Sequence, residues 1–200
     1  MSAETLPPQF KLYSGTLSYQ PDPGLKPTHF DDCFEAKDRH TQECNDLPAD
    51  APTQMQVFSY TGKLPIPRRH LPGHSGMLKS DAAKLASTPC LSIGYCFSPD
   101  WSSPSKSCYV EWEKCDDSKP EQVWEFLRVP YFKDTGRGKL DTFQIRNRKF
   151  NVCLTNENYK SHHAYPICLT EFVTTCLKVG SNPQVKNYQE GTQTWQVLPV

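Results

Sequence analysis

The stretch EQVWEF at residues 121–126 carries the pattern that decides the fold prediction, because it occurs twice more in altered form. Its counterparts are MQVF at 55–58 and TQTWQV at 192–197, so each copy holds a glutamine, one variable residue and a large aromatic residue. The glutamines of successive copies lie 66 and 71 residues apart. A motif that returns at such a spacing indicates a chain built from repeated supersecondary units.

Cysteines mark the same three repeats. A cysteine followed by a large apolar residue precedes each glutamine motif, at Cys33-Phe34, Cys90-Leu91 and Cys153-Leu154. A second cysteine lies between this pair and the glutamine motif in every repeat, at positions 44, 115 and 176. Three features that recur in the same order indicate three diverged copies of one unit.

The segments between these motifs have the character of β-strands. They are short, rich in β-branched and aromatic residues, and separated by clusters of Pro, Gly, Asp and Asn, which is typical of strands joined by turns. We expect strands over 10–15 (FKLYSG), 109–115 (YVEWEKC), 123–129 (VWEFLRV), 142–154 (TFQIRNRKFNVCL) and 194–200 (TWQVLPV). The sequence therefore predicts an all-β fold.

One stretch suits a helix. In SGMLKSDAAKLAST at 75–88, the side chains of Met77, Leu78 and Leu85 fall on one face at helical spacing. Eighteen prolines and ten glycines interrupt the chain too often for long helices. We therefore expect a single short helix, inserted at the start of the second repeat.

Composition and motifs exclude several classes of function. Lys and Arg together number 22, as do Asp and Glu, so bulk charge gives no attraction to nucleic acid or to an anionic membrane. No apolar run approaches the roughly 20 residues needed to cross a bilayer, so we expect no membrane insertion. Signature motifs of hydrolases, phosphate loops, zinc proteases and dinucleotide-binding proteins are absent from the sequence. We expect no enzymatic activity, no cofactor and no metal.

Nine cysteines without a Cys-x-x-Cys pair favour disulfides over a zinc or redox site. Disulfides imply an oxidising compartment, although residues 1–20 contain no apolar signal core. Two interpretations follow: a secreted protein from which a signal peptide has been removed, which we favour, or a cytosolic protein with free thiols.

The repeats resemble those of the ricin B-type β-trefoil, the Gln-x-Trp lectin family. The matching segments are CLS (90–92) leading to EQVWEF, FQIRNRKFNVCLT (143–155) leading to TQTWQV, and, more distantly, CFEAK (33–37) leading to MQVF. The resemblance implies one all-β domain, a β-trefoil over residues 1–200 with extended loops and three repeats of four strands, at about 1–62, 63–130 and 131–200. Six strands would close a barrel and six would cap it, since no single repeat can bury its own apolar face.

The same resemblance implies a pairing of the cysteines. The first and second cysteine of each repeat would form a disulfide, and the two nested cysteines of the second repeat would form another. The implied pairs are Cys33 with Cys44, Cys90 with Cys115, Cys153 with Cys176, and Cys96 with Cys108. Cys168 has no partner in this scheme, and sequence alone does not fix the connectivity.

The resemblance also implies carbohydrate binding in shallow pockets that combine a stacking aromatic with polar side chains. The position two after the first cysteine, often an Asp in the family, is Glu35, Ser92 and Thr155 in the three repeats. The second repeat holds the best candidate aromatic. The residues expected to contact the glycan or glycoprotein are Trp112, Asp116, Asp117, Gln122 and, from the loop at 98–107, Trp101.

Structural interpretations stand beside these functional ones. Trp112 also suits a half-buried strand aromatic, and the glutamines also suit structural turns. The loops at 20–32, 63–89 and 98–107 lengthen the repeats and favour an alternative function: a trefoil with decayed sugar sites that binds protein through its loops, as a protease inhibitor or secreted effector.

Overall fold

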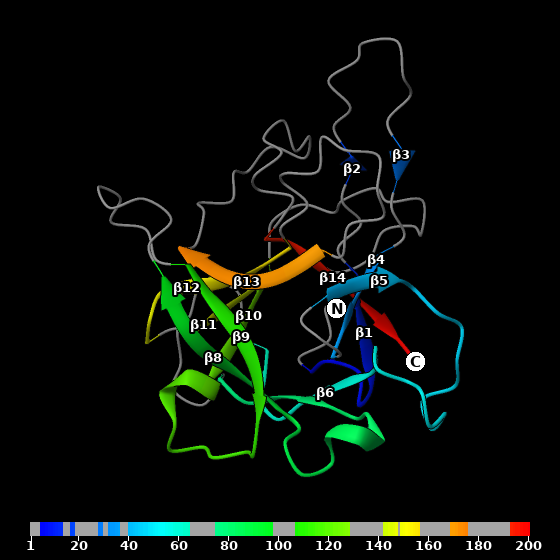
Figure 1. The fold of residues 1–200 in the computed structure, drawn as a ribbon, viewed down its shortest axis with the longest axis horizontal. Coiled ribbons are helices and arrows are strands. Elements are labelled where there is room, and N and C mark those ends of the chain that lie inside the picture. The colour runs from blue at the N-terminus through cyan, green and yellow to red at the C-terminus, as the bar shows by residue number, and fades with distance from the viewer. Residues whose placement is uncertain are drawn as a thin grey trace.

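The computed structural model of the chain describes residues 5–13, 17–18, 28–29, 32–36, 40–64, 75–97, 107–128, 142–147, 149–156, 169–175 and 193–200. Most of these residues lie in β-strands or in the turns between them (Figure 1). The helical elements within these ranges are two short 3-10 turns, η1 (Ala83–Leu85) and η2 (Pro120–Gln122). The prediction of an all-β fold is confirmed.

Twelve strands form one hydrogen-bonded sheet, and four of them fall in each predicted repeat. The first repeat contributes β1 (Phe10–Tyr13), β4 (Asp32–Glu35), β5 (His40–Glu43) and β6 (Phe58–Tyr60). The second contributes β7 (Leu78–Ser80), β8 (Cys90–Phe97), β9 (Ser107–Glu113) and β10 (Trp124–Arg128). The third contributes β11 (Thr142–Asn147), β12 (Val152–Asn156), β13 (Leu169–Thr175) and β14 (Trp195–Pro199). A separate ladder joins β2 (Leu17–Ser18) to β3 (Thr28–His29).

Six of these strands close into a ring. β1 pairs with β6 and β14, β6 with β7, β10 with β11, and β11 with β14. The ring is completed just before β7, where the N–H and carbonyl of Gly76 exchange hydrogen bonds of 2.9 and 2.8 Å with Trp124. A Cβ at position 76 would lie 2.1 Å from the backbone nitrogen of Gly62, so this close approach requires glycine. The six strands form a closed barrel.

The other six strands form three hairpins, β4–β5, β8–β9 and β12–β13. The first cysteine of each repeat pairs with a barrel strand, in the pairs Cys33 with Tyr13, Cys90 with Lys79, and Cys153 with Arg146. β13 also pairs with β5 and β9, which joins the hairpins to one another. A six-stranded barrel with three attached hairpins is the β-trefoil architecture, as predicted.

Hydrogen bonds explain why the cysteine and glutamine motifs recur together. Nε1 of Trp124, fully buried, donates a 2.9 Å hydrogen bond to the carbonyl of Leu91, the apolar residue after the first cysteine. In the third repeat, Nε1 of Trp195 donates equivalently to the carbonyl of Leu154 at 3.0 Å. A buried indole N–H needs such a partner, so the two motifs of each repeat are joined in the core.

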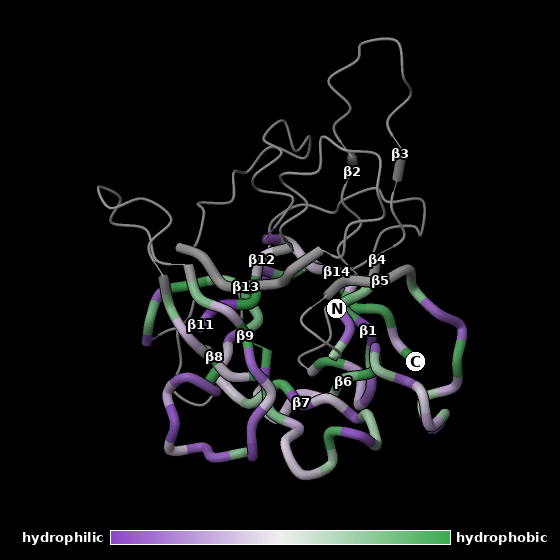
Figure 2. Tube along the Cα trace, viewed as in Figure 1, coloured by the Kyte–Doolittle hydropathy of each residue, from purple (hydrophilic) through white to green (hydrophobic). Residues whose placement is uncertain are grey.

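The first repeat has a phenylalanine in place of this tryptophan. Phe58 has no N–H to donate and instead stacks on Phe34, with ring centroids 5.0 Å apart. The apolar residue after the first cysteine and the aromatic of the glutamine motif therefore meet in all three repeats. Figure 2 shows hydrophobic residues along the strands and mostly hydrophilic residues along the loop between β9 and β10.

Three disulfides have the predicted pairing. They join Cys33 to Cys44, Cys90 to Cys115, and Cys96 to Cys108. Cys153 is also disulfide-bonded. Its predicted partner, Cys176, and the unassigned Cys168 lie outside the described residues.

The helix expected over 75–88 is wrong in extent. Leu78–Ser80 forms strand β7, in which buried Leu78 and Ser80 flank a more exposed Lys79, and only Ala83–Leu85 makes a helical turn. Over so short a stretch the spacing of the apolar residues suits both the helical period of 3.6 and the strand period of 2. The pairing of β7 with β6 decides in favour of the strand. Among the described residues, no helix is long and apolar enough to span a membrane.

Candidate functional site

The glutamine of each Gln-x-aromatic motif is buried and satisfies polar groups within its own repeat. Oε1 of Gln56 accepts a 2.9 Å hydrogen bond from the backbone N–H of Asn45, the residue after the second cysteine. Oε1 of Gln122 accepts the equivalent bond, also 2.9 Å, from the backbone N–H of Asp116. The amides of the first two repeats therefore hold the chain directly after the second cysteine.

In the first and third repeats the other end of the amide points to the position two after the first cysteine, where the family resemblance implies an acidic residue. Nε2 of Gln56 donates to the Glu35 carboxylate at 3.3 Å. In the third repeat Nε2 of Gln193 donates to the Thr155 hydroxyl, also at 3.3 Å. Of these two repeats, only the first has a carboxylate at this position.

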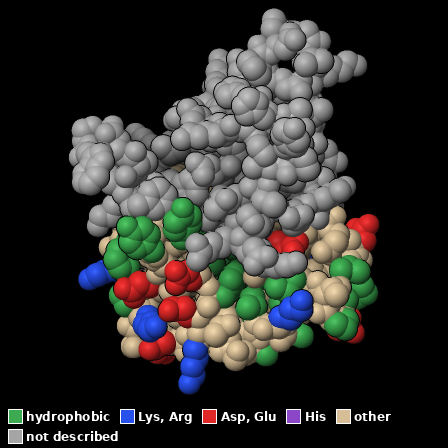
Figure 3. Space-filling model, viewed as in Figure 1, with side chains coloured by type: hydrophobic (Ala, Val, Ile, Leu, Met, Phe, Trp, Pro, Cys, Tyr) green, Lys and Arg blue, Asp and Glu red, His purple; other side chains and the backbone are tan. Residues whose placement is uncertain are grey.

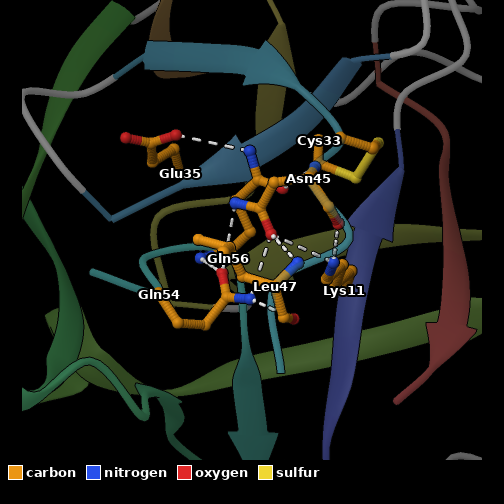
Figure 4. Close-up of a disulfide and its surroundings, with 8 residues drawn as sticks. Lys11, Cys33, Glu35, Asn45, Leu47, Gln54 and Gln56 are labelled. Atoms are coloured by element: carbon orange, nitrogen blue, oxygen red, sulfur yellow. Dashed lines mark hydrogen bonds between the residues drawn. A yellow bond between two sulfur atoms is a disulfide. The ribbon is translucent and has the colours of Figure 1, made fainter. Parts of the chain in front are cut away.

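A dense amide network surrounds the first-repeat glutamine (Figure 4). Gln54 donates through Nε2 to Asn45 Oδ1 at 3.0 Å and to the Leu47 carbonyl at 2.9 Å. Lys11 donates through Nζ to the carbonyl and the side-chain oxygen of Asn45. One oxygen of the Glu35 carboxylate faces Gln56 and the other points away from the network. Glu35 is therefore held at the edge of a rigid polar cluster.

In the second repeat the carboxylate comes from β9 instead. Nε2 of Gln122 donates to Oε2 of Glu113 at 3.1 Å and to the Lys114 carbonyl at 3.0 Å. The Glu113 side chain is 37% exposed, and Lys119 Nζ lies 3.4 Å from its Oε2. Hydrogen bonds from the Ser92 hydroxyl and from Gln122 hold the pKa of Glu113 below its usual range. The second repeat therefore presents an ionised, positioned and accessible carboxylate.

Trp112 lies on the opposite side of β9 from Glu113. It pairs with Leu91, and its ring stacks on Phe58 at a centroid distance of 6.0 Å and lies 5.9 Å from Phe34. Successive residues of a strand point to opposite faces, so a core-facing Trp112 directs its neighbour Glu113 outward. Trp112 is therefore a half-buried strand aromatic, which is the structural interpretation that the sequence also allowed.

The remaining predicted contact residues are spread over the turn between β9 and β10. The Asp116 carboxylate accepts hydrogen bonds from the Ser118 hydroxyl, at 2.6 Å, and from its backbone N–H, at 3.0 Å, and these bonds lower the pKa of Asp116. Asp117 is exposed and lines a cavity that Trp112 does not reach. The structure thus brings Asp116 and Gln122 together. Trp112 faces the core and Asp117 lines a separate cavity, so neither joins them, and Trp101 lies outside the described residues.

Sequence reasoning missed the residues on the outer face of the β8–β9 hairpin. We call this the hairpin face and define it by Ser92, Gly94, Glu111 and Glu113. The Glu111 side chain covers Gly94, because a Cβ there would lie 2.4 Å from its carboxyl carbon. Tyr95, directly after Gly94, is 71% exposed. The alternation of apolar Val110 and Trp112 with two glutamates was the signal that could have located this face.

Charged side chains gather on the side of the molecule that carries β8 and β9. Figure 3 shows acidic and basic side chains next to each other there, beside a group of hydrophobic ones. The described residues 111–119 hold four acidic residues, Glu111, Glu113, Asp116 and Asp117, against two lysines, Lys114 and Lys119. This side of the molecule is therefore polar and mildly acidic, and the two glutamates of the hairpin face are partly exposed on it.

Comparisons with known proteins identify the fold. No protein-family model and no curated protein matches the chain. Among solved structures, it is similar to a designed threefold-symmetric protein, ThreeFoil, with a TM-score of 0.50 at 11% identity over 96% of this chain and 99% of that one. It is also similar to the BEL beta-trefoil, with a TM-score of 0.47 at 15% identity over 100% of this chain and 97% of that one. At 11% identity the likeness to ThreeFoil shows the β-trefoil fold alone.

Proposed function

We propose that this β-trefoil binds glycans, without catalysis, along the hairpin face of its second repeat. The observation that supports this most directly is the joint presence of a positioned carboxylate, Glu113, and an exposed aromatic, Tyr95, on one hairpin. A sugar ring offers apolar C–H faces to an aromatic and hydroxyl groups to acceptors. Tyr95 lies five positions along β8 from Cys90, the partner of Glu113, which is about 16 Å, so the two side chains would contact different rings of one oligosaccharide. Membership of the ricin B-type lectins belongs to the same proposal.

The Glu113 carboxylate is suited to accept sugar hydroxyls. Hydrogen bonds from Ser92 and Gln122 fix its position, and the same bonds lower its pKa. Hydrogen bonds to a charged acceptor are stronger than those between neutral groups, and an acceptor that is already positioned loses little entropy on binding. Glu111, which lies over Gly94, supplies a second carboxylate between Glu113 and Tyr95 along the hairpin.

The three repeats differ in how open their amide clusters are. Glu35 in the first repeat is partly exposed beside Gln56, so it offers a second acceptor of the same kind. In the third repeat Thr155, Gln193 and Gln144 are all buried, and their side chains bond to one another. We therefore assign binding to the second repeat, and Glu35 of the first repeat adds only an acceptor.

The proposal includes secretion and a glycoprotein or glycan partner. Disulfides persist in oxidising compartments, and the described residues contain three of them. The alternative, protein binding through long loops, depends on the loops at 20–32, 63–89 and 98–107, of which 65–74, 98–106 and most of 20–32 lie outside the described residues. It stays a prediction without a structural observation in its favour.

A glycan array followed by calorimetry tests the proposal. The wild type should retain a defined set of glycans, and Glu113→Gln should weaken binding about tenfold to a hundredfold, since a charged acceptor contributes about 1.5–3 kcal/mol. Tyr95→Ala should weaken it about fivefold. Asp50→Asn, which removes an exposed carboxylate in another loop, serves as the charge-matched control. A wild type that retains no glycan, or a Glu113→Gln variant that binds normally, would refute the proposal.

A further inference from the structure

A cavity of about 560 Å³ lies at the junction of the second and third repeats, away from the hairpin face. Its lining comes from the segment before β7, from the turn around η2 and from the turn between β11 and β12: Ser75, Asp117, Ser118, Pro120, Val123 and Lys149. We call it the junction pocket. Asp117 and Lys149 are 32 positions apart in the chain, so only the packed trefoil brings their charges to one cavity.

The walls of the junction pocket are fixed to one another by Asn147. This side chain is fully buried, and its Nδ2 donates to the carbonyls of Pro120 at 2.8 Å and Glu121 at 3.3 Å. Its Oδ1 accepts a 3.2 Å bond from the backbone N–H of Phe150, directly after Lys149. A single amide thus joins the η2 wall to the Lys149 wall, so the pocket is formed before any ligand enters.

The remaining wall is equally rigid. Ser75 immediately precedes Gly76, whose N–H and carbonyl both bond to Trp124, and Val123 immediately precedes Trp124. Pro120 and Val123 contribute apolar surface, whereas Ser75 and Ser118 contribute hydroxyl groups. The pocket combines an apolar lining with polar groups on rigid elements, which is the usual composition of a small-molecule site.

The two charges of the pocket are available to a ligand. Asp117 and Lys149 are both exposed, and within the part of the chain that the structure describes neither makes an ion pair or a side-chain hydrogen bond. A carboxylate only accepts hydrogen bonds and an ammonium only donates them. A ligand hydroxyl can do both, so a ring with several hydroxyls can satisfy both side chains together.

We infer that the junction pocket is a second saccharide subsite, for a neutral hexose ring. The C–H face of the ring would lie on Pro120 and Val123, and its hydroxyls would bond to Asp117, Lys149 and the two serines. This inference deepens the proposed function, because it adds a place for the same class of ligand, but it stands on different residues. Between the two sites runs the turn at 114–119, whose Lys119 contacts Glu113 on the hairpin side.

Nuclear magnetic resonance titration of the ¹⁵N-labelled full chain separates the two sites. The probes are methyl glycosides of glucose, galactose, mannose and N-acetylglucosamine, and the readout is the backbone amide shift of each residue. At least one probe should shift Ser75, Ser118, Val123 and Lys149 with saturation. Lys149→Ala and Asp117→Asn should each raise Kd at the pocket at least fivefold, whereas Lys84→Ala and Asp50→Asn, exposed elsewhere, should not change it.

Each outcome bears on one hypothesis. Shifts confined to Ser92, Glu111 and Glu113 would overturn the junction pocket and leave the proposed function standing. Shifts confined to the junction pocket would support it and overturn the hairpin face as the main site. A response of the pocket to glycylglycine and not to any glycoside would show a zwitterion site and refute the saccharide assignment. The absence of any response at the pocket would also refute the saccharide assignment.

Discussion

Gln56 in the first repeat and Gln122 in the second occupy equivalent positions but contact different polar groups. In both, the amide oxygen accepts the backbone N–H after the second cysteine, at 2.9 Å. Six residues separate Cys115 from Gln122, whereas 11 separate Cys44 from Gln56. The longer loop of the first repeat inserts Gln54, whose amide fills the space beside Asn45 and Leu47. The shorter loop leaves Gln122 in contact with Glu113 on the hairpin face.

The turn after the second cysteine shows how similar the two repeats remain. The backbone N–H of Leu47 bonds to Asn45 Oδ1 at 3.2 Å, and that of Ser118 bonds to Asp116 Oδ1 at 3.0 Å. These are Asx turns at equivalent positions. The difference between the repeats therefore lies in which carboxylate the amide reaches. A scaffold held by backbone bonds allows its polar neighbours to change without loss of the fold.

Removing a disulfide should have the largest effect on stability in either repeat. Cys33–Cys44 closes 11 residues, and Cys90–Cys115 closes 25, of which the nested Cys96–Cys108 bridge bypasses 12. Loop-closure entropy over about 11 and about 14 residues predicts losses of about 2.8 and about 3 kcal/mol when each pair is replaced by alanine, so the two repeats should lose similar amounts. Cys33 and Cys90 are equally buried, so their truncation costs are similar as well. Urea unfolding of the two double variants measures this, and a much larger loss in one repeat than in the other would contradict it.

Exchanging the core aromatic should have the next largest effect. Trp124→Phe gives the second repeat the aromatic of the first, and it leaves the buried Leu91 carbonyl without its 2.9 Å bond. The lost bond and the smaller ring should cost about 2 kcal/mol in the free energy of unfolding. Trp195→Phe is the matched variant, since its Nε1 makes the same bond to Leu154. Thermal or urea unfolding that is unchanged in both variants would contradict this role of the indole.

The smallest effect concerns pH and is specific to the second repeat. The pKa of Glu113 is lower in the folded chain than its ordinary value, so its contribution to stability is present above that value and is lost as pH falls through the folded pKa. Because more than a third of the Glu113 side chain is exposed, solvent screens this interaction and the contribution should be well under 1 kcal/mol. The stability difference between the wild type and Glu113→Gln should therefore shrink below about pH 4.5.

Ser92→Ala provides the second arm of this experiment. The Ser92 hydroxyl is the largest cause of the lowered pKa of Glu113, so its removal should reduce the same pH dependence without removing the charge. Unfolding midpoints between pH 3 and pH 7 measure both variants. A Ser92→Ala variant with the full pH dependence of the wild type would show that the hydroxyl has no such role.

Much of the fold could be predicted because its signals are local and repeated. The Cys-apolar and Gln-x-aromatic motifs marked residues that meet in the core, as the bond from Trp124 to Leu91 shows. The prediction for 75–88 was wrong because the spacing of apolar residues in so short a segment fits both a helix and a strand. The pairing of β7 with β6, which the local spacing does not show, makes Leu78–Ser80 a strand.

The candidate site was less predictable, for a geometric reason. Trp112 and Glu113 are neighbours in sequence, and alternation says only that they face opposite ways. Which of them faces the core depends on Phe34 and Phe58, which come from the first repeat and pack against Trp112. The surroundings of Asp117 depend likewise on Lys149 from the third repeat.

The sequence by itself determined that the chain is all-β, that it has three repeats, and which cysteines and aromatics are equivalent, and its resemblance to a lectin family implied the trefoil. These properties follow from buried contacts within one repeat, and such contacts leave a pattern in the order of residues. Only the tertiary structure decided that Trp112 faces the core and Glu113 the surface, and which charges share the junction pocket. Those arrangements join side chains from different repeats, and no spacing along the chain records them.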